Sequence, residues 1–225
     1  MSQSLRILLA SLMFCACLST VSITRDTVEG TLEIGVPVGW DLSGRSIEDY
    51  FVFIDRSIVH GGNASATLVA LEVEWRGYGK FQQTIRANNY AGHRVRFRAF
   101  VRTNKVDDWC ALWMRADSET HSGIAFDDMP ARRIEGTTNW RSYDVVLDIP
   151  EDAKALVFGA VLAGIGQIWI DDCALEVVGH EVKTTGDFNP RMKVNRRPIA
   201  PDLKLDPINL DFEGEVAEYL YDIDF

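Results

Sequence analysis

The sequence predicts an all-β protein, built as a two-sheet antiparallel β-sandwich. Apolar and basic residues alternate with a period of two through residues 92–116, which is typical of strands that bury one face. Short apolar runs recur along the chain with turn residues between them, as in other sandwiches. No convincing amphipathic helix pattern precedes residue 179.

The central stretch, residues 92–116, is expected to form a hairpin with a polar turn at residues 103–108. Its first strand should send an apolar row to the core and a mostly basic row outward; the apolar row is Val95, Phe97, Ala99 and Val101. In the second strand, Leu112 and Met114 should face the core, which sends Trp113 and Arg115 outward. A lone ribbon cannot bury its apolar face, so a second sheet must cover it.

The remaining elements follow in order. Residues 37–65 look irregular because glycines interrupt them, and Pro150 should end a strand. The run 155–163 is apolar on both faces, which favours a covered central strand. Together with the hairpin this gives about nine strands, the others being expected at residues 31–36, 66–75, 81–87, 122–126, 140–149 and 167–178.

Length and charge limit the possibilities further. The chain has 225 residues, enough for one domain with extensions or for two small domains. The formal net charge of −10 argues against a general nucleic-acid partner, because such proteins need a basic surface.

The first 22 residues have the pattern of a signal peptide. Arg6 precedes a largely apolar run at residues 7–18, which is too short to span a bilayer comfortably. We therefore expect export to the periplasm or the extracellular space, with no transmembrane segment in the mature chain. Phe14 and Cys15 fit badly before a lipidated cysteine, which argues against a lipid anchor at Cys17.

Composition divides the rest of the chain into three parts. Residues 23–178 should be the sandwich domain. Residues 179–207 are rich in proline and basic residues and are expected to be a linker. Residues 208–225 form an acidic tail with interspersed aromatic residues. This tail could be solvated, or its aromatic residues could dock on the sandwich or on a protein partner.

A series of motifs resembles a known module. The runs are QQTIRANNYAGHRVRFRAFVRT, WCALWMRAD, FDDM, EGTTNWRSYDVVLDIP and FGAVLAGIGQIWIDDCALEVV. Over residues 30–178 the chain resembles a bacterial β-sandwich found alone, C-terminal to AraC-type transcriptional regulators and in some exported proteins. It is more distantly similar to jelly-roll carbohydrate-binding modules. The sequence has no helix-turn-helix pattern, so the resemblance does not imply regulator activity.

The resemblance also implies a metal site. In jelly-roll sugar binders the first acid of a pair such as Asp171-Asp172 often holds a structural Ca²⁺ with an acidic residue near the first strand, here Glu33. Oxygen ligands from both ends of a domain suit Ca²⁺. Alternatively, Asp171 satisfies backbone donors nearby.

The outward face of the central stretch supplies the first candidate ligand site. Trp113 could stack on a sugar while Arg115, Arg96 and Arg98 hold its hydroxyls or an acidic substituent. Alternatively, these arginines form cross-strand ion pairs with acidic residues of neighbouring strands.

A loop and two cysteines complete the candidates. Asp127 and Asp128 lie in a charged loop and could contribute a carboxylate pair to a hydrolase, although adjacent acids in a loop are usually just solvated. No Gly-x-Ser-x-Gly or His-Glu-x-x-His motif accompanies them. Export would permit a disulfide between Cys110 and Cys173; the alternative is two buried free thiols.

These observations favour an exported, non-catalytic module that binds carbohydrate or a similar polar ligand. The alternative is a structural or protein-interaction module of the cell envelope that uses residues 208–225 or a sheet face. A hydrolase with its catalytic pair in the Asp127 loop is a third hypothesis.

Overall fold

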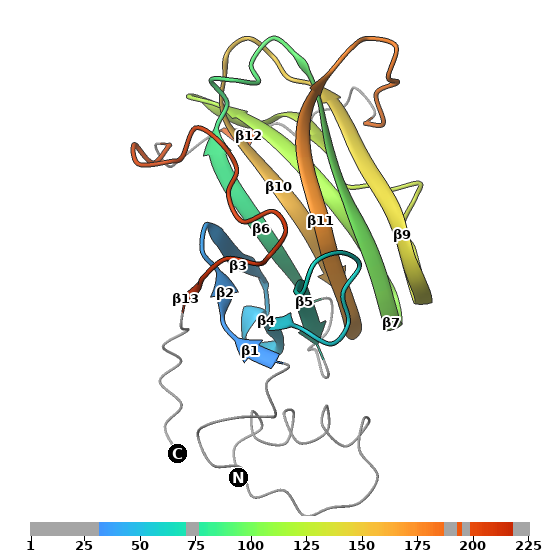
Figure 1. Ribbon diagram of the computed structural model, residues 1–225. Coiled ribbons are helices and arrows are strands. Elements are labelled where there is room, and N and C mark those ends of the chain that lie inside the picture. The colour runs from blue at the N-terminus through green and yellow to red at the C-terminus, as the bar shows by residue number, and fades with distance from the viewer. Residues whose placement is uncertain (1–31, 71–76, 187–192, 195–198, 218–225) are drawn as a thin grey trace, which may run out of the picture.

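The computed structural model describes residues 32–70, 77–186, 193–194 and 199–217, and these form an antiparallel β-sandwich (Figure 1). Apart from a single 3-10 turn at Ile47–Asp49, the described elements are strands. They are β1 (Leu32–Ile34), β2 (Val36–Pro37), β3 (Trp40–Arg45), β4 (Tyr50–Asp55), β5 (Ser65–Ala70), β6 (Tyr78–Arg86), β7 (Arg94–Ser118), β8 (His121–Asp127), β9 (Ile134–Asp148), β10 (Ala153–Ala163), β11 (Gly166–Val178), β12 (Lys193–Val194) and β13 (Val216–Ala217). The all-β sandwich predicted from the sequence is therefore confirmed.

The expected hairpin in the centre of the chain is wrong, because residues 94–118 form one continuous strand, β7. Lys105 takes a left-handed conformation with φ of 52°, and the pairing between β7 and β9 slips at this point. The pairing nevertheless continues past the slip, since Val106 lies opposite Gly136 and Cys110 opposite Ile134. The polar residues at 103–108 therefore bend the strand instead of reversing it.

The bend in β7 makes this strand a member of both layers. Its first half pairs with β9 and β11, and its second half pairs with β8 and β10. One layer then runs β9-β7-β11-β5-β4-β1, and the other runs β8-β7-β10-β6-β3. The core lies between the layers and includes Phe97, Leu112 and Phe158, whose side chains are fully buried.

The segment 37–65, expected to be irregular, contains β3 and β4. In β4 the side chains of Tyr50, Val52 and Ile54 are buried and alternate with partly exposed ones. One of the glycines that suggested a loop permits close packing between strands: a Cβ on Gly44 would lie 2.0 Å from the carbonyl oxygen of Tyr78 on β6.

A C-terminal segment, residues 201–217, runs along the edge of β6 and is called the strap here (Figure 1). The amide of Arg86 donates to the carbonyl of Lys204 at 2.8 Å. The buried Gln83 side chain makes two bonds to the backbone of Ile208, accepting from its N–H at 2.9 Å and donating to its carbonyl at 2.8 Å. The Arg86 bond lies on the part of the β6 edge that β3 leaves unpaired, whereas Gln83, which lies opposite Trp40 of β3, reaches the strap through its side chain.

Phe212 fixes the far end of the strap in the core. Its side chain is fully buried, and its ring centroid lies 5.3 Å from that of Trp40 and 5.9 Å from that of Phe81. Shortly after it, β13 pairs with β2. The prediction of a solvated tail is therefore wrong at Phe212, and the alternative, docking of an aromatic residue on the sandwich, is confirmed there. Residues 218–225 of the predicted tail lie outside the described residues.

Cys110 and Cys173 are both buried free thiols, so the possible disulfide is not formed. Cys173 lies in β11 opposite the stretch of β7 near Arg98 and Phe100. Burial raises the pKa of the Cys110 thiol to about 12, and it also raises the pKa of Cys173.

Replacing Phe212 with alanine should destabilise the whole sandwich. The change leaves a cavity beside the stacked rings of Trp40 and Phe81, and truncation of a buried phenylalanine typically costs about 3–5 kcal/mol. Chemical denaturation of the full chain measures this loss. Leu205→Ala is the control, because this strap side chain is 50% exposed and its loss should cost less than about 0.5 kcal/mol. Equal effects of the two changes would contradict the role given to Phe212.

Candidate ligand-binding site

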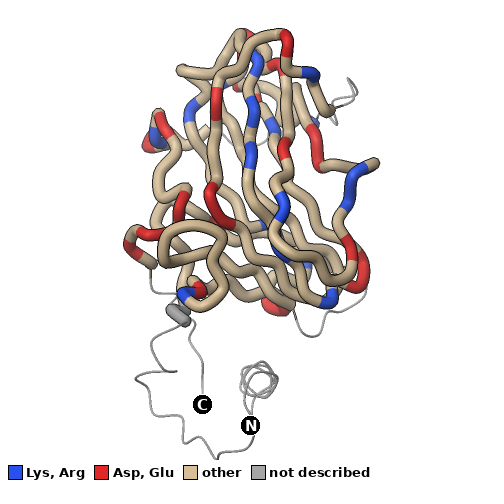
Figure 2. The backbone as a smooth tube through the Cα atoms, turned by 45° about the vertical axis from the view of Figure 1, so that its right-hand side comes forward, with Lys and Arg blue, Asp and Glu red and all other residues tan. Residues whose placement is uncertain are grey.

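The outer face of β7 carries a row of arginines, most of which pair with neighbouring strands. Figure 2 shows basic and acidic residues close to one another on neighbouring strands of the sandwich. Arg94 bonds Asp148 of β9 at 2.7 Å, and Arg96 bonds Glu176 of β11 at 2.6 Å. The strand register places the two members of each pair directly opposite each other. Arg96 therefore forms a cross-strand ion pair, which was the alternative to a role in ligand binding. The Arg94 guanidinium lowers the pKa of Asp148.

Arg98 differs from its neighbours in this row. The residue opposite it on β11 is Ala174, which has no group to pair with a guanidinium. Its Nε is buried and has no hydrogen-bond partner within the described part of the chain. The sheet therefore holds the Arg98 guanidinium in place but provides no hydrogen-bond acceptor for its Nε within the described part of the chain.

A bulge in β11 opens space beside Arg98. The pairing with β7 slips between Asp171 and Ala174, and Asp172 takes a left-handed conformation with φ of 48°. The strap follows the bulge, because the amide of Cys173 donates to the carbonyl of Leu210 at 3.0 Å. Pairing of β11 with β5 ends at Ile170, so the strap takes over this edge.

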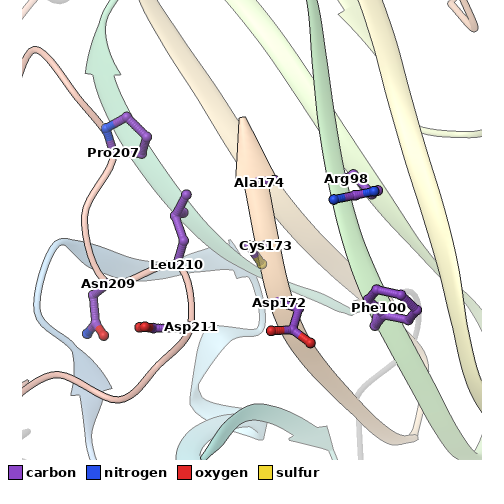
Figure 3. A pocket seen from close by; sticks show the side chains of 9 residues that line it. All are labelled: Arg98, Phe100, Asp172, Cys173, Ala174, Pro207, Asn209, Leu210 and Asp211. Carbon is purple, nitrogen blue, oxygen red and sulfur yellow. The ribbon is translucent and has the colours of Figure 1, made fainter. Parts of the chain in front are cut away.

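The result is a cleft of about 650 Å³ between the sheet and the strap (Figure 3). Arg98 and Phe100 of β7 form one side, and the strap forms the other (Figure 3). The lining residues are Arg98, Phe100, Asp172, Cys173, Ala174, Pro207, Asn209, Leu210 and Asp211. This mixture of apolar surface with a few polar side chains is typical of ligand pockets.

Asp171 holds the loop between β4 and β5, residues 56–64, against the sheet. Its buried carboxylate accepts the backbone N–H groups of His60 at 2.7 Å, Gly61 at 3.1 Å and Asp172 at 2.7 Å. Burial raises the pKa of Asp171, while these three bonds act in the opposite direction. The expected alternative for Asp171, satisfaction of backbone donors, is what the structure shows.

His60 contacts two residues that line the cleft, Phe100 and Asp172, and was missed by sequence reasoning. Its ring stacks on Phe100 with centroids 3.5 Å apart, and its Nδ1 lies 2.6 Å from Oδ2 of Asp172. Trp140 of β9 meets the same imidazole edge-on at 5.7 Å. An isolated histidine in a loop carries no motif, so the sequence has no signal that would place it here.

Trp113 is not the exposed platform that the alternation of β7 suggested. It lies on the expected face, but its side chain is 1% exposed. Lys80 covers its ring at 4.3 Å from the centroid, and Arg115 lies 5.8 Å away. Arg115 pairs with Asp117 at 2.8 Å. The structure brings Arg98 into the cleft, whereas Trp113 and Arg115 lie on the half of β7 that belongs to the other layer.

Asp127 organises its own loop. Its buried carboxylate accepts the amide of Met129 at 2.8 Å, the guanidinium of Arg132 at 3.0 Å and the hydroxyl of Thr185 at 2.7 Å. Asp128 is half-buried and lies outside the cleft. These contacts favour a structural role for Asp127 over a catalytic one.

The calcium site stays a prediction. Asp171 uses its oxygens on backbone donors, and the Glu33 side chain lies outside the described side chains. No cluster of three metal-ligating side chains occurs among the described residues.

Asp171→Asn should lower the free energy of unfolding by about 1–3 kcal/mol, because an amide cannot accept on both sides and leaves a buried N–H unpaired. Denaturation with excess Ca²⁺ and with a chelator measures the effect. The hydrogen-bonding role predicts the same loss under both conditions. A loss seen only with Ca²⁺ would mean that Asp171 acts through the metal. Asp172→Asn, at a side chain 43% exposed, is the control and should cost less.

Comparison with known proteins gives one sequence relative. No family model matches the chain. An uncharacterised HTH-type transcriptional regulator of Bacillus subtilis (strain 168), YbfP, is 37% identical over 181 residues, which cover 80% of this chain. The chain spans 58% of the length of that relative. The relative's name agrees with the expected link to transcriptional regulators and does not specify the AraC type.

Solved structures with similar folds include an enzyme domain and sugar-binding modules. The enzymatically active domain of bacteriophage CBA120 tailspike protein 4 has a TM-score of 0.52 and 14% identity, covering 63% of this chain and 20% of that one. TmCBM61, solved with β-1,4-galactotriose, has a TM-score of 0.45 and 14% identity over 64% of this chain and 92% of that module. A family 22 carbohydrate-binding module of Clostridium thermocellum Xyn10B has a TM-score of 0.45 and 12% identity, with coverages of 71% and 100%. At these identities the likeness concerns the fold alone.

No helix in the described part of the chain has the length and apolar character needed to cross a membrane.

Proposed function

We propose that this protein is an exported, non-catalytic module that binds a carbohydrate in the cleft between the strap and the sheet. The observation that carries the proposal is the juxtaposition of Arg98 with Phe100 in a cleft of about 650 Å³. The cleft combines a surface for stacking with groups for hydrogen bonding.

The chemistry of the lining suits a sugar. His60 covers one face of the Phe100 ring, so the part of Phe100 that lines the cleft supplies the remaining aromatic surface for the apolar face of a pyranose ring. Asp172, Asn209 and Asp211 supply acceptors and an amide donor for hydroxyl groups. Such polar groups give orientation and specificity within a mostly apolar pocket.

The wider comparisons are consistent with ligand recognition. Jelly-roll sugar-binding modules share this fold, and YbfP is named as a regulator. A ligand-recognition domain can serve in both kinds of protein, whereas the activity of the whole regulator need not extend to this chain.

The alternative functions have less support. The interaction hypothesis relied on residues 208–225 or on a sheet face; within the tail, Leu210 lines the cleft and Phe212 is buried in the core. The hydrolase hypothesis relied on Asp127, whose carboxylate is engaged by three groups of its own domain. A carboxylate committed to holding a loop is poorly placed to act as an acid or a nucleophile.

A glycan array probed with the purified chain tests sugar binding. We expect a reproducible hit that Phe100→Ala weakens by about fivefold or more, since loss of an aromatic stacking surface costs on the order of 1 kcal/mol or more. Phe51→Ala is the matched control, because Phe51 is a half-buried aromatic residue on β4, two strands away from β11. An unchanged affinity in Phe100→Ala would move the site elsewhere, and a blank array for the parent chain would contradict the proposal.

Export is tested separately by expressing the full chain in a bacterial host and sequencing the N-terminus of the protein. We expect it outside the cytoplasm, beginning after residue 22. A protein retained in the cytoplasm with residues 1–22 intact would show that this part of the proposal is wrong.

A further inference from the structure

The pairing pattern along β7 indicates what kind of ligand the cleft takes. Arg94 and Arg96 each have a carboxylate on a neighbouring strand, and Arg102 lies over the ring of Trp169 at 5.6 Å. Arg98 breaks this pattern: Ala174 faces it on β11, and Asp144, which faces it on β9, forms its ion pair with Arg132 instead. The missing partner coincides with the position at which the cleft opens.

The nearby carboxylates are engaged with other groups. Asp144 lies opposite Arg98 on β9, but its ion pair is with Arg132 at 4.0 Å. Asp172 pairs with His60, and Asp211 accepts the amide of Glu213 at 3.3 Å. Within the described part of the chain, Arg98 thus forms no hydrogen bond or ion pair.

A guanidinium that is partly withdrawn from water gains most from a planar acceptor with two oxygens, because two parallel N–H bonds can form. We infer that the ligand is an acidic saccharide and that its carboxylate, as in a uronic acid, binds Arg98. This inference rests on the proposed carbohydrate-binding function and names the class of sugar for the same cleft.

The rest of the cleft limits how much negative charge the ligand carries. Asp211 lies on the strap, on the side of the cleft away from Arg98 (Figure 3). Carboxylates such as Asp211 and Asp172 accept hydrogen bonds from hydroxyls and repel other anions. The site therefore suits one carboxylate beside Arg98 and uncharged, hydroxyl-rich groups towards the strap.

The test compares matched sugars that differ only in the acid group. Polygalacturonate, alginate and hyaluronan are each offered to the full chain beside their carboxyl-reduced, neutral forms, and affinity is measured by titration calorimetry. We expect at least one acidic polymer to bind about tenfold or more tightly than its reduced form, because charged hydrogen bonds are stronger than neutral ones.

Variants of the arginines on β7 show which residue causes the preference for acidic over neutral sugars. Arg98→Gln should abolish the discrimination between the acidic and neutral forms. Arg102→Gln removes the same charge from the same face and should keep the discrimination. Arg98→Lys keeps the charge but loses the two-pronged geometry, so most of the preference should disappear. Thermal unfolding checks that each variant is folded.

The outcomes separate the inference from the function on which it rests. Equal binding of acidic and neutral forms, or a preference that survives Arg98→Gln, would overturn the acidic ligand and leave sugar binding intact. An equal loss in Arg102→Gln would also overturn it, since attraction to general positive charge would then explain the result. Failure to bind any glycan, neutral or acidic, would overturn both proposals.

Discussion

The attachment of the strap to the edge of β6 is the constraint on which the candidate site depends. The buried Gln83 side chain pairs with both backbone groups of Ile208, and four residues later Phe212 enters the core beside Trp40. Between these two anchors the strap must pass β11, where Leu210 meets the amide of Cys173. The strap wall of the cleft is therefore held by the same contacts that complete the core. The strap consequently contributes both to the candidate ligand site and to the stability of the fold.

The second wall follows from the geometry of β7. Because this strand bends and belongs to both layers, its first half presents the row from Arg94 to Arg102 on one outer face. Beside the bulge in β11 the residue opposite Arg98 is Ala174, and Asp144 on β9 pairs with Arg132, so neither neighbouring strand gives Arg98 a carboxylate partner. The same bulge turns Asp172 towards His60, while Asp171 anchors the loop that carries this histidine. A local irregularity in one strand thereby accounts for the space and for the aromatic stack.

The sequence predicted the fold because period-two alternation reports directly which side chains a sheet buries; Val95, Phe97 and Ala99 are all buried as expected. The sequence could not show whether the strand bends at Lys105 or reverses there into a hairpin, since polar residues such as those at 103–108 are typical of both. Alternation also placed Trp113 on the correct face, but the exposed fraction depends on Lys80, which comes from a distant strand. The cleft itself was not predictable, because it is formed by a bulge and by contacts between segments more than 100 residues apart, such as Gln83 and Ile208.

The most direct test of the account is hydrogen–deuterium exchange of the chain with and without a glycan identified on the array. Binding in the cleft predicts slower amide exchange on both of its walls, at residues 207–213 of the strap and at residues 57–64 and 171–174. The amides around Lys80 and Trp113 should exchange as in the free protein. Protection confined to the face that carries Lys80 and Trp113, with the strap unchanged, would contradict the account and place the ligand on the other layer.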